Sequence, residues 1–428
     1  MKKLLLILLG GLLVLSFAGC EGNETETPKQ TTSVSQNNNA DEPAEIKEKL
    51  SWEKINAFPI KRSDMTEEEM RQLVVDFYIF SKTFVWVADN DYTYQVADGA
   101  GRESLETGGV YAGFPYISKG TSNVYRLMDF MDPQTGVLHV ADAGANSRML
   151  GNQCSMSCQW AWARVVNSVK GGWTDQITQA NGYIPVGPYT YSADLEEFNK
   201  RNSIESIVAE NGQDIMNQSY AQLKAGDGLV KSGHVILCTG APYVVYDENG
   251  AIDPAESYIL MSEQTRNTGW KGYTNDSGDQ YLMCGNINKK YSFKKLYEQE
   301  YLPFTFKEYT GADPIEKTEV SFSHTGQTIS KEQLMGAKVT SNYYISDIYA
   351  AVTDSKGNEV YRFAVRNTAP ASLELVFTED NKTSDGNPAY TIWGSWEALS
   401  SDEEYTVQII AQLGTGERPT LWEGKLER

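Results

Sequence analysis

The spacing of apolar residues divides this chain into two regions that predict different kinds of structure. From Thr66 to about residue 310, segments with apolar residues at helical spacing alternate with short apolar segments typical of strands. The first helix opens with a capping box, because Thr66 is followed three residues later by Glu69. Further helices are predicted at 155–169, 211–223 and 292–300, and strands at 137–141, 228–240, 243–247 and 257–264. We therefore expect residues 50–316 to form one domain of mixed helices and strands.

The hydrophobic pattern changes after about residue 318, where helical spacing stops and alternation takes over. The segments ISDIYAAVTD and EVYRFAV alternate on either side of the turn sequence SKGN, which predicts a β-hairpin. The segments LELVFT and YTVQIIAQL repeat the alternation further along the chain. Short strands at this spacing predict a β-sandwich of immunoglobulin-like type over residues 317–428. The expected fold class is thus α+β, with a mixed domain followed by an all-β domain.

The first 20 residues have the pattern of an export signal. Two lysines precede an apolar run from Leu4 to Leu15, which is shorter than the about 20 residues that a bilayer-spanning helix needs. The small residues before Cys20 resemble the lipobox of bacterial lipoproteins, with Phe17 where Leu or Val is more usual. The resemblance implies that Cys20 becomes the lipidated first residue, so we expect an extracytoplasmic protein held on the bacterial membrane by a lipid anchor. An ordinary secretory signal with an incidental cysteine is the alternative.

The next segment and the overall charge narrow the class of partner. Residues 21–49 contain no aromatic residue and few aliphatic ones, so they cannot bury enough apolar surface to offset their ordering entropy, which predicts a disordered tether. The net charge of the chain is −20, and it becomes −22 when residues 1–19, with two lysines and no acid, are removed. This acidity argues against nucleic acid or an anionic lipid surface as the main partner.

The stretch GNQCSMSCQWAWARV contains two of the five cysteines, Cys154 and Cys158, at the start of a predicted helix. With Asn152 as the N-cap, Cys154 lies in the first turn, where free backbone N–H groups and the helix dipole favour a thiolate. A disulfide between the two is disfavoured, because side chains one turn apart on a helix aim poorly at one another. A metal pair would need further ligands at suitable spacing, and burial of both thiols in the core is another interpretation. If Cys154 is a nucleophile, it needs a base from elsewhere in the chain.

Only three histidines can supply that base. His324 falls in the β-rich tail and His139 in a segment without other chemical signals, whereas His234 opens the apolar strand HVILC. The following apolar strand ends in Glu263 and Gln264, which alternation places on opposite faces, so only one of them can orient the His234 ring. A carboxylate in that position would hold the tautomer and stabilise the imidazolium. A surface pair at a strand end is the alternative interpretation of these two residues.

The order of these residues resembles that of the NlpC-type papain-like cell-wall peptidases and of the related CHAP amidases. Cys154 and Ser155 match the Cys-Ser pair at the helix start, His234 matches the histidine that opens a strand, and Glu263 matches the acidic third position of CHAP-like members. The resemblance covers about residues 75–310. It implies a papain-like fold for the mixed domain, a catalytic role for Cys154, His234 and the third residue, and a place beside the substrate for Ser155.

A second segment also resembles these enzymes. The stretch GGVYAGFPYISKG is similar to the Gly-x-Pro-Tyr segment that borders the cleft in larger relatives, and the matching positions are Gly113, Pro115 and Tyr116. The chain departs from the family pattern next to the cysteine, where Gln153 replaces the common Asp and Met156-Ser157 replaces the usual Gly-aromatic pair. These departures bear on the shape of the substrate subsites.

The resemblance implies hydrolysis of an amide bond in peptidoglycan peptides, by an endopeptidase or amidase that requires no metal or organic cofactor. Two alternatives stay open: a non-catalytic wall-binding or scaffold lipoprotein that keeps the fold, and a related acyl or peptide transferase.

The remaining two cysteines are either core residues or partners in a disulfide. Cys238 lies on the same strand face as His234 and is expected in the core, and a disulfide between Cys238 and Cys284 is neither indicated nor excluded.

Overall fold

The computed structural model describes residues 49–58, 65–97, 99–132, 134–145, 147–166, 183–192, 203–310, 317–368, 372–383 and 386–427. The predicted signal at 1–20 lies outside these residues, as does the predicted tether at 21–49 except for its last residue. Residues 43–428 form one compact unit. None of the described helices is both long enough and apolar enough to span a bilayer. The mixture of helices and sheets confirms the α+β class at this coarse level.

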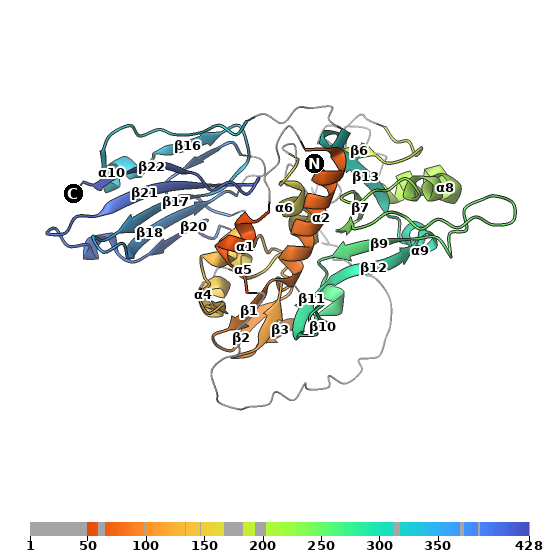
Figure 1. Ribbon diagram of the computed structural model, residues 1–428, viewed down its shortest axis with the longest axis horizontal. Helices are drawn as coiled ribbons and strands as arrows, with labels where there is room; N and C mark the ends of the chain where they lie inside the picture. The colour runs from red at the N-terminus through yellow and green to blue at the C-terminus, as the bar shows by residue number, and fades with distance from the viewer. Residues whose placement is uncertain are drawn as a thin grey trace, which may run out of the picture. The chain divides into compact units, whose positions relative to one another are not determined.

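Six antiparallel strands form the sheet that carries most of the candidate chemistry, in the order β12-β9-β8-β7-β13-β6 (Figure 1). The strands are β6 (Tyr183–Pro185), β7 (Gly228–Lys231), β8 (His234–Cys238), β9 (Tyr258–Glu263), β12 (Asn286–Ser292) and β13 (Leu302–Phe306). Because β8 and β9 are antiparallel neighbours with Leu237 opposite Ser262, the start of β8 lies beside the end of β9. The sheet therefore brings the two ends that carry His234 and Glu263 together.

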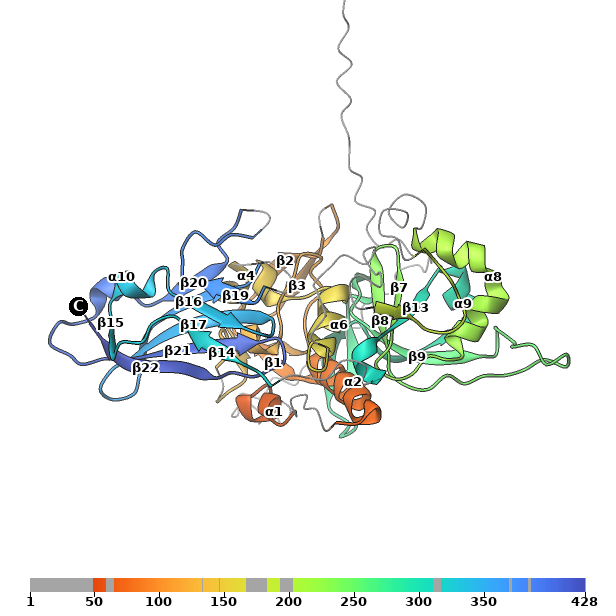
Figure 2. The same cartoon turned by 90° about the horizontal axis from the view of Figure 1, so that it is seen from above.

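Helices pack on this sheet and position its edge. The longer ones are α2 (Glu67–Thr83), α6 (Cys154–Trp162) and α8 (Ile204–Tyr220), and α9 is short (Phe293–Glu298). Helix α6 packs against both α2 and β8 and lies between them (Figure 2), whereas α8 packs against α9, β7 and β13. The first residue of α6 is thus held at the sheet by contacts on two sides.

A second, five-stranded sheet has the order β10-β11-β4-β1-β5, with parallel pairing of β1 with β5 and of β11 with β4. Its strands are β1 (Val85–Ala88), β4 (Val110–Ala112), β5 (Val137–Leu138), β10 (Trp270–Thr274) and β11 (Gln280–Cys284). The hairpin of β2 (Tyr92–Gln95) and β3 (Arg102–Leu105) forms a two-stranded sheet of its own. The short helices of this region are α1 (Trp52–Asn56), α3 (Val124–Met128), α4 (Val140–Ala145) and α5 (Ser147–Leu150). In the described residues, 3₁₀ turns cover Arg266–Thr268, Lys307–Thr310 and Trp396–Ala398.

The C-terminal region consists of a six-stranded sheet, β15-β22-β21-β17-β18-β20, and a three-stranded sheet, β14-β16-β19. Its strands are β14 (Val320–Phe322), β15 (Thr328–Ile329), β16 (Lys338–Ser341), β17 (Ile345–Thr353), β18 (Glu359–Arg366), β19 (Glu374–Val376), β20 (Tyr390–Trp393), β21 (Thr406–Leu413) and β22 (Thr420–Leu426). The predicted hairpin around SKGN is confirmed as β17 and β18. We expected no helix after residue 318, and this is wrong, because α10 (Lys331–Leu334) forms one helical turn. Ser330 and Gln333 form a capping box at its start.

Several predicted boundaries differ from the structure for identifiable reasons. The capping box at Thr66 is confirmed, but α8 begins before the predicted 211–223 helix and continues through Gly212, which has a non-helical φ of 74°. The predicted 228–240 strand is a hairpin, because the chain turns at Gly233 with φ 72°. Residues 243–247 make only single bridges, from Tyr243 to Tyr258 and from Tyr246 to Ile252.

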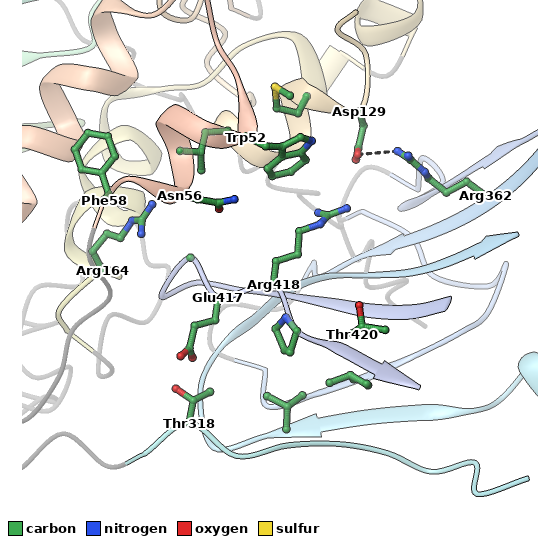
Figure 3. A pocket seen from close by; sticks show the side chains of 16 residues that line it. Trp52, Asn56, Phe58, Asp129, Arg164, Thr318, Arg362, Glu417, Arg418 and Thr420 are labelled. Carbon is green, nitrogen blue, oxygen red and sulfur yellow. Dashed lines mark hydrogen bonds and ion pairs between the residues drawn. The ribbon is translucent and has the colours of Figure 1, made fainter. Parts of the chain in front are cut away.

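Within the parts of the chain that the structure describes, buried hydrophobic residues form two clusters, one within residues 50–309 and one within 329–413. Ion pairs join the elements around the two clusters. Arg126 of α3 contacts Asp347 of β17 at 3.0 Å, and Asp129 contacts Arg362 of β18 at 3.0 Å (Figure 3). The C-terminal sheet is therefore tied to the α3 region by two ion pairs, of which Arg126–Asp347 is fully buried.

Candidate active site

Cys154 is the first residue of α6, as expected, but the helix begins differently from the prediction. The N-cap is Gln153, with extended φ −119° and ψ 175°, and it makes no side-chain cap hydrogen bond. Asn152 is not the cap, because its backbone is held in bridges to Tyr116 and Thr121 and its side-chain oxygen accepts a hydrogen bond from Ser157 at 3.0 Å. The thiol still lies in the first turn, where the N–H groups have no acceptor within the helix.

The three residues predicted to border a cleft lie next to the segment that leads into this helix. Gly113, Pro115 and Tyr116 are all buried. The Pro115 carbonyl accepts a hydrogen bond from the Asn152 N–H at 3.2 Å, and Tyr116 makes a backbone bridge to the same residue. Gly113 has φ 67°, and a Cβ there would lie 2.6 Å from the backbone oxygen of Lys82. These residues therefore help to set the position of the segment that leads into Cys154. Ser155, the next residue of the helix, is half-buried.

His234 and Glu263 meet at the edge of the six-stranded sheet. The His234 Nε2 and the Glu263 Oε2 are 2.8 Å apart, and the two residues are only 5% and 4% exposed. The other carboxylate oxygen accepts hydrogen bonds from Asn286 at 2.6 Å and from Tyr291 at 2.9 Å. The carboxylate is thus fixed in place and aimed at the histidine ring.

Gln264, the other residue considered for this role, points to the opposite face. Its side-chain N–H group donates to the Phe114 carbonyl at 2.9 Å, and its oxygen accepts a hydrogen bond from the buried ammonium of Lys82. The same ammonium donates to the Cys284 carbonyl at 2.7 Å. Gln264 is therefore part of an internal polar cluster, and Glu263 is the residue that contacts His234.

The Cys154 thiol lies against His234. Burial acts to raise its pKa, but the charge of His234, a hydrogen bond with the His234 side chain and backbone N–H groups of Val235 and Ser155 together hold that pKa below its usual value. Because Glu263 occupies Nε2, the ring nitrogen available to the thiol is Nδ1. The sulfur lies 4.0 Å from the Gly233 carbonyl oxygen, at the turn before β8. This arrangement favours a thiolate–imidazolium pair.

The electrostatics of Glu263 complete the arrangement. Burial acts to raise its pKa, but hydrogen bonds from His234, Tyr291 and Asn286 and the charge of His234 lower it to about 2. The carboxylate is therefore ionised throughout the neutral range. A fixed negative charge at this distance orients the ring and stabilises its protonated form.

The other described cysteines lack this environment. All four described cysteines are free thiols, so the Cys238–Cys284 disulfide is not formed. Burial raises the pKa of Cys158 well above its usual value, raises that of Cys238, and raises that of Cys284 to about 11. The interpretation of Cys158 and Cys238 as core residues is confirmed, since both are fully buried.

Sequence reasoning did not identify two of the groups that hold Glu263. Asn286 and Tyr291 are five positions apart on β12, which regular alternation places on opposite faces of the sheet. An irregularity in the pairing between Asn286 and Lys289 shifts the register, so both side chains reach the same carboxylate. Asn288, inside this irregularity, has a positive φ of 49°. No local sequence signal marks such a shift.

The two other histidines make contacts elsewhere. His139 is about half exposed and its Nδ1 lies 3.0 Å from Asp89, and the Nε2 of His324 lies 2.7 Å from the Thr328 carbonyl. Among the described residues, no group of three or more His, Cys, Asp or Glu side chains is arranged to hold a metal ion.

No model of a known protein family matches the chain, and a search of curated proteins finds none that matches it.

The pKa pattern predicts selective alkylation of one thiol. At pH 7, iodoacetamide should modify Cys154 at least about tenfold faster than Cys158, Cys238 or Cys284, because only the Cys154 pKa is lowered. Modification of Cys154 should continue at pH values below about 8.5, the usual pKa of a thiol. Its rate should fall only as the pH drops through the lowered pKa of Cys154. Mass spectrometry of the alkylated peptides measures each site. Equal rates at the four thiols would contradict the thiolate assignment.

Proposed function

We propose that this chain is a cysteine hydrolase that cleaves an amide bond in peptidoglycan peptides, with Cys154 as nucleophile, His234 as base and acid, and Glu263 as the residue that orients His234. The observation that supports it best is the convergence of three separate segments on one point. The thiol at the start of α6 lies against His234, whose other ring nitrogen is 2.8 Å from an ionised carboxylate. A nucleophile, its base and an orienting group in this order are the parts of acyl transfer.

In the proposed reaction, the Cys154 proton resides on His234 and the thiolate attacks the amide carbonyl carbon, forming a C–S bond. The negative charge on the carbonyl oxygen is stabilised by N–H groups of the first turn of α6. The C–N bond then breaks as His234 gives its proton to the departing amine. Water attacks the thioester with His234 accepting its proton, the C–S bond breaks, and the acid is released.

The fold arrangement supports the finer assignment to the papain-like class as part of this proposal. A helix that starts with the nucleophile packs on an antiparallel sheet, and neighbouring strands of that sheet supply the histidine and the carboxylate. The assignment of the C-terminal strands to an immunoglobulin-like sandwich is likewise a proposal, supported by two sheets around one buried cluster. The wall substrate is supported by the resemblance in sequence and by the lipobox-like residues before Cys20, where a lipid anchor would hold the enzyme outside the membrane.

The test is mass spectrometry of purified peptidoglycan fragments after incubation with the full-length protein, purified in mild detergent, and with its Cys154→Ala variant. New fragments are expected only with the wild type, and their masses identify the bond. Cys238→Ala is the matched control, because it removes a thiol that makes no contact with His234 in the described hydrogen bonds but leaves Cys154 intact. Fragments produced equally by Cys154→Ala would contradict the proposal.

One observation favours the rival function, a wall-binding lipoprotein without catalysis. Cys154 and His234 are only 4% and 5% exposed, so a substrate has little direct access to them in this conformation. Under that rival, wild type and Cys154→Ala would both co-sediment with the wall and leave every fragment intact. A transferase would instead give products that contain an added acceptor amine.

A further inference from the structure

A lysine of the five-stranded sheet reaches the hydrogen bonds that hold Glu263. Lys271 lies on β10, at the edge of that sheet, and is half-buried. Its Nζ donates to the Oδ1 of Asn286 at 2.5 Å. Asn286 is the first residue of β12 in the six-stranded sheet, and its side-chain N–H group donates to Glu263 at 2.6 Å. Lys271 is therefore connected to the candidate active site through one intermediate side chain.

The path of the chain between the two sheets brings these residues together. Strands β11 and β12 follow one another in the chain but belong to different sheets, and Gly285 lies between them (Figure 1). A Cβ at Gly285 would lie 2.4 Å from the Glu263 carbonyl oxygen, and its φ of 95° also favours glycine. Lys271 pairs with Met283, two residues before this glycine. The crossing thus places the Asn286 amide within reach of both side chains.

Only one orientation of the Asn286 amide fits its two neighbours. An ammonium group has only donors, and an ionised carboxylate has only acceptors. The amide oxygen therefore faces Lys271, and the amide N–H group faces Glu263, whose pKa of about 2 keeps it ionised. Hydrogen bonds in such a chain polarise one another, so an ammonium on the oxygen makes the N–H group a stronger donor. The Lys271 contact both fixes and strengthens the hydrogen bond that holds the carboxylate.

Charged and titratable groups from four other elements surround Lys271. Burial, and then the charge of Lys289 on β12, lower the pKa of Lys271, whereas Glu263 of β9 and Cys284 of β11 act to raise it. Lys82 of α2 is a further cation nearby, because the charge of Lys271 acts to lower its pKa. Burial and two like charges thus disfavour an ammonium at this position. The hydrogen bond to the amide and the attraction to Glu263 offset them.

We propose that Lys271 is a positioning residue of the candidate active site, and that it acts on His234 through the two side chains between them. The other carboxylate oxygen of Glu263 lies 2.8 Å from His234 Nε2, and His234 lies against the Cys154 thiol. A firmly held carboxylate keeps the imidazole in place and stabilises the imidazolium, which in turn keeps Cys154 as a thiolate. The role in catalysis rests on the proposed function, but the state of the thiol is measured without a substrate.

The pH dependence of Cys154 alkylation by iodoacetamide, measured on the purified full-length protein, tests this inference. Mass spectrometry of the peptides gives the rate at each pH, and the midpoint of the curve reports the pKa of Cys154. Cys158 and Tyr78 are titratable groups near the thiol, and burial raises the pKa of both well above their usual values. They therefore keep their protons where Cys154 titrates.

Lys271→Met removes the donor and keeps the apolar stem. The amide and the carboxylate are then held less firmly, and less imidazolium forms beside the thiol. The midpoint should move to higher pH by about 0.5–1 unit, which corresponds to about three- to tenfold slower alkylation below it. Lys271→Arg keeps a cationic donor on the same strand and should restore most of the shift. If Lys271→Met does not fold in urea unfolding measurements, Lys271→Ala also lacks the donor and carries the comparison.

Lys289→Met is the matched control for charge. The Lys289 Nζ lies 3.9 Å from the Glu263 carboxylate, and the lysine side chain is 42% exposed. This variant removes the same charge beside the same carboxylate and leaves the hydrogen bond between Lys271 and Asn286 in place. Its midpoint should move by less than about 0.3 unit, because a solvent-exposed partner contributes little. Equal shifts in Lys289→Met and Lys271→Met, or no shift in Lys271→Met, would overturn the inference.

Hydrolysis of wall fragments extends the comparison to catalysis. In Lys271→Met, kcat should fall by about three- to tenfold while KM stays the same, because a positioning residue does not bind the substrate. If the wild type alkylates selectively at Cys154 but hydrolyses nothing, the proposed function fails and the alkylation midpoints still decide the role of Lys271. If Cys154 of the wild type reacts no faster than the other thiols, the thiolate assignment and this inference are both overturned.

Discussion

Replacing His234 by alanine is expected to reduce hydrolysis of the wall substrate by roughly 10⁴-fold or more. The variant loses the base that lies against Cys154 and also the positive charge that lowers the pKa of the thiol. Burial, which acts to raise that pKa, then keeps the thiol protonated at neutral pH. The nucleophile and its proton acceptor are therefore lost in a single substitution.

Two rates measured on the same preparations check this prediction: the initial release of wall fragments and the alkylation of Cys154 at pH 7. Both should fall together in His234→Ala. The matched control is His139→Ala, because His139 is about half exposed and contacts Asp89, and neither rate should change. A His234→Ala variant that keeps hydrolysis within tenfold of the wild type would show that another group is the base.

Replacing Asp347 by alanine is expected to lower the free energy of unfolding by about 3–5 kcal/mol. The carboxylate contacts Arg126 at 3.0 Å, and the two residues are 1% and 2% exposed. Without Asp347, the Arg126 guanidinium stays buried with hydrogen bonds to neutral acceptors, the carbonyls of Thr121 and Ser346 at 2.9 and 3.1 Å and the Thr121 hydroxyl at 3.4 Å. An uncompensated buried charge, more than the lost attraction itself, causes the expected destabilisation.

Urea unfolding followed by tryptophan fluorescence measures this change. Lys425→Ala is the control, because its ion pair with Glu404 is exposed and should contribute less than about 1 kcal/mol. The double variant Arg126→Met with Asp347→Leu should recover most of the loss, since it removes both buried charges and fills their volume. If Asp347→Ala unfolds at the same urea concentration as Lys425→Ala, the buried pair does not stabilise the contact between α3 and β17.

The elements that sequence reasoning predicted correctly depend on neighbours along the chain. The capping box at Thr66, the hairpin around SKGN and the placement of Cys154 at a helix start each follow from a few adjacent residues. The strand that His234 opens follows from a turn and an apolar run. Alternation also showed that Glu263 and Gln264 face opposite sides, although it did not show which side carries the histidine.

Contacts between segments that are distant in the chain decided which side chains meet at the candidate active site. Glu263 contacts His234 because β8 and β9 pair in one register, and an irregularity in β12 brings Asn286 to the same carboxylate. Gln153 rather than Asn152 caps α6, because bridges to Tyr116 and Thr121 hold the backbone of Asn152.

The sequence by itself thus determined the local elements and the residues able to carry the chemistry, since propensity, periodicity and capping act over a few positions. Only the tertiary structure decided which of those residues meet and what surrounds them. The pKa of Cys154 is lowered, against the effect of burial, by His234, a residue far away in the chain. Burial and strand register are properties of the packed whole, and no local pattern encodes them.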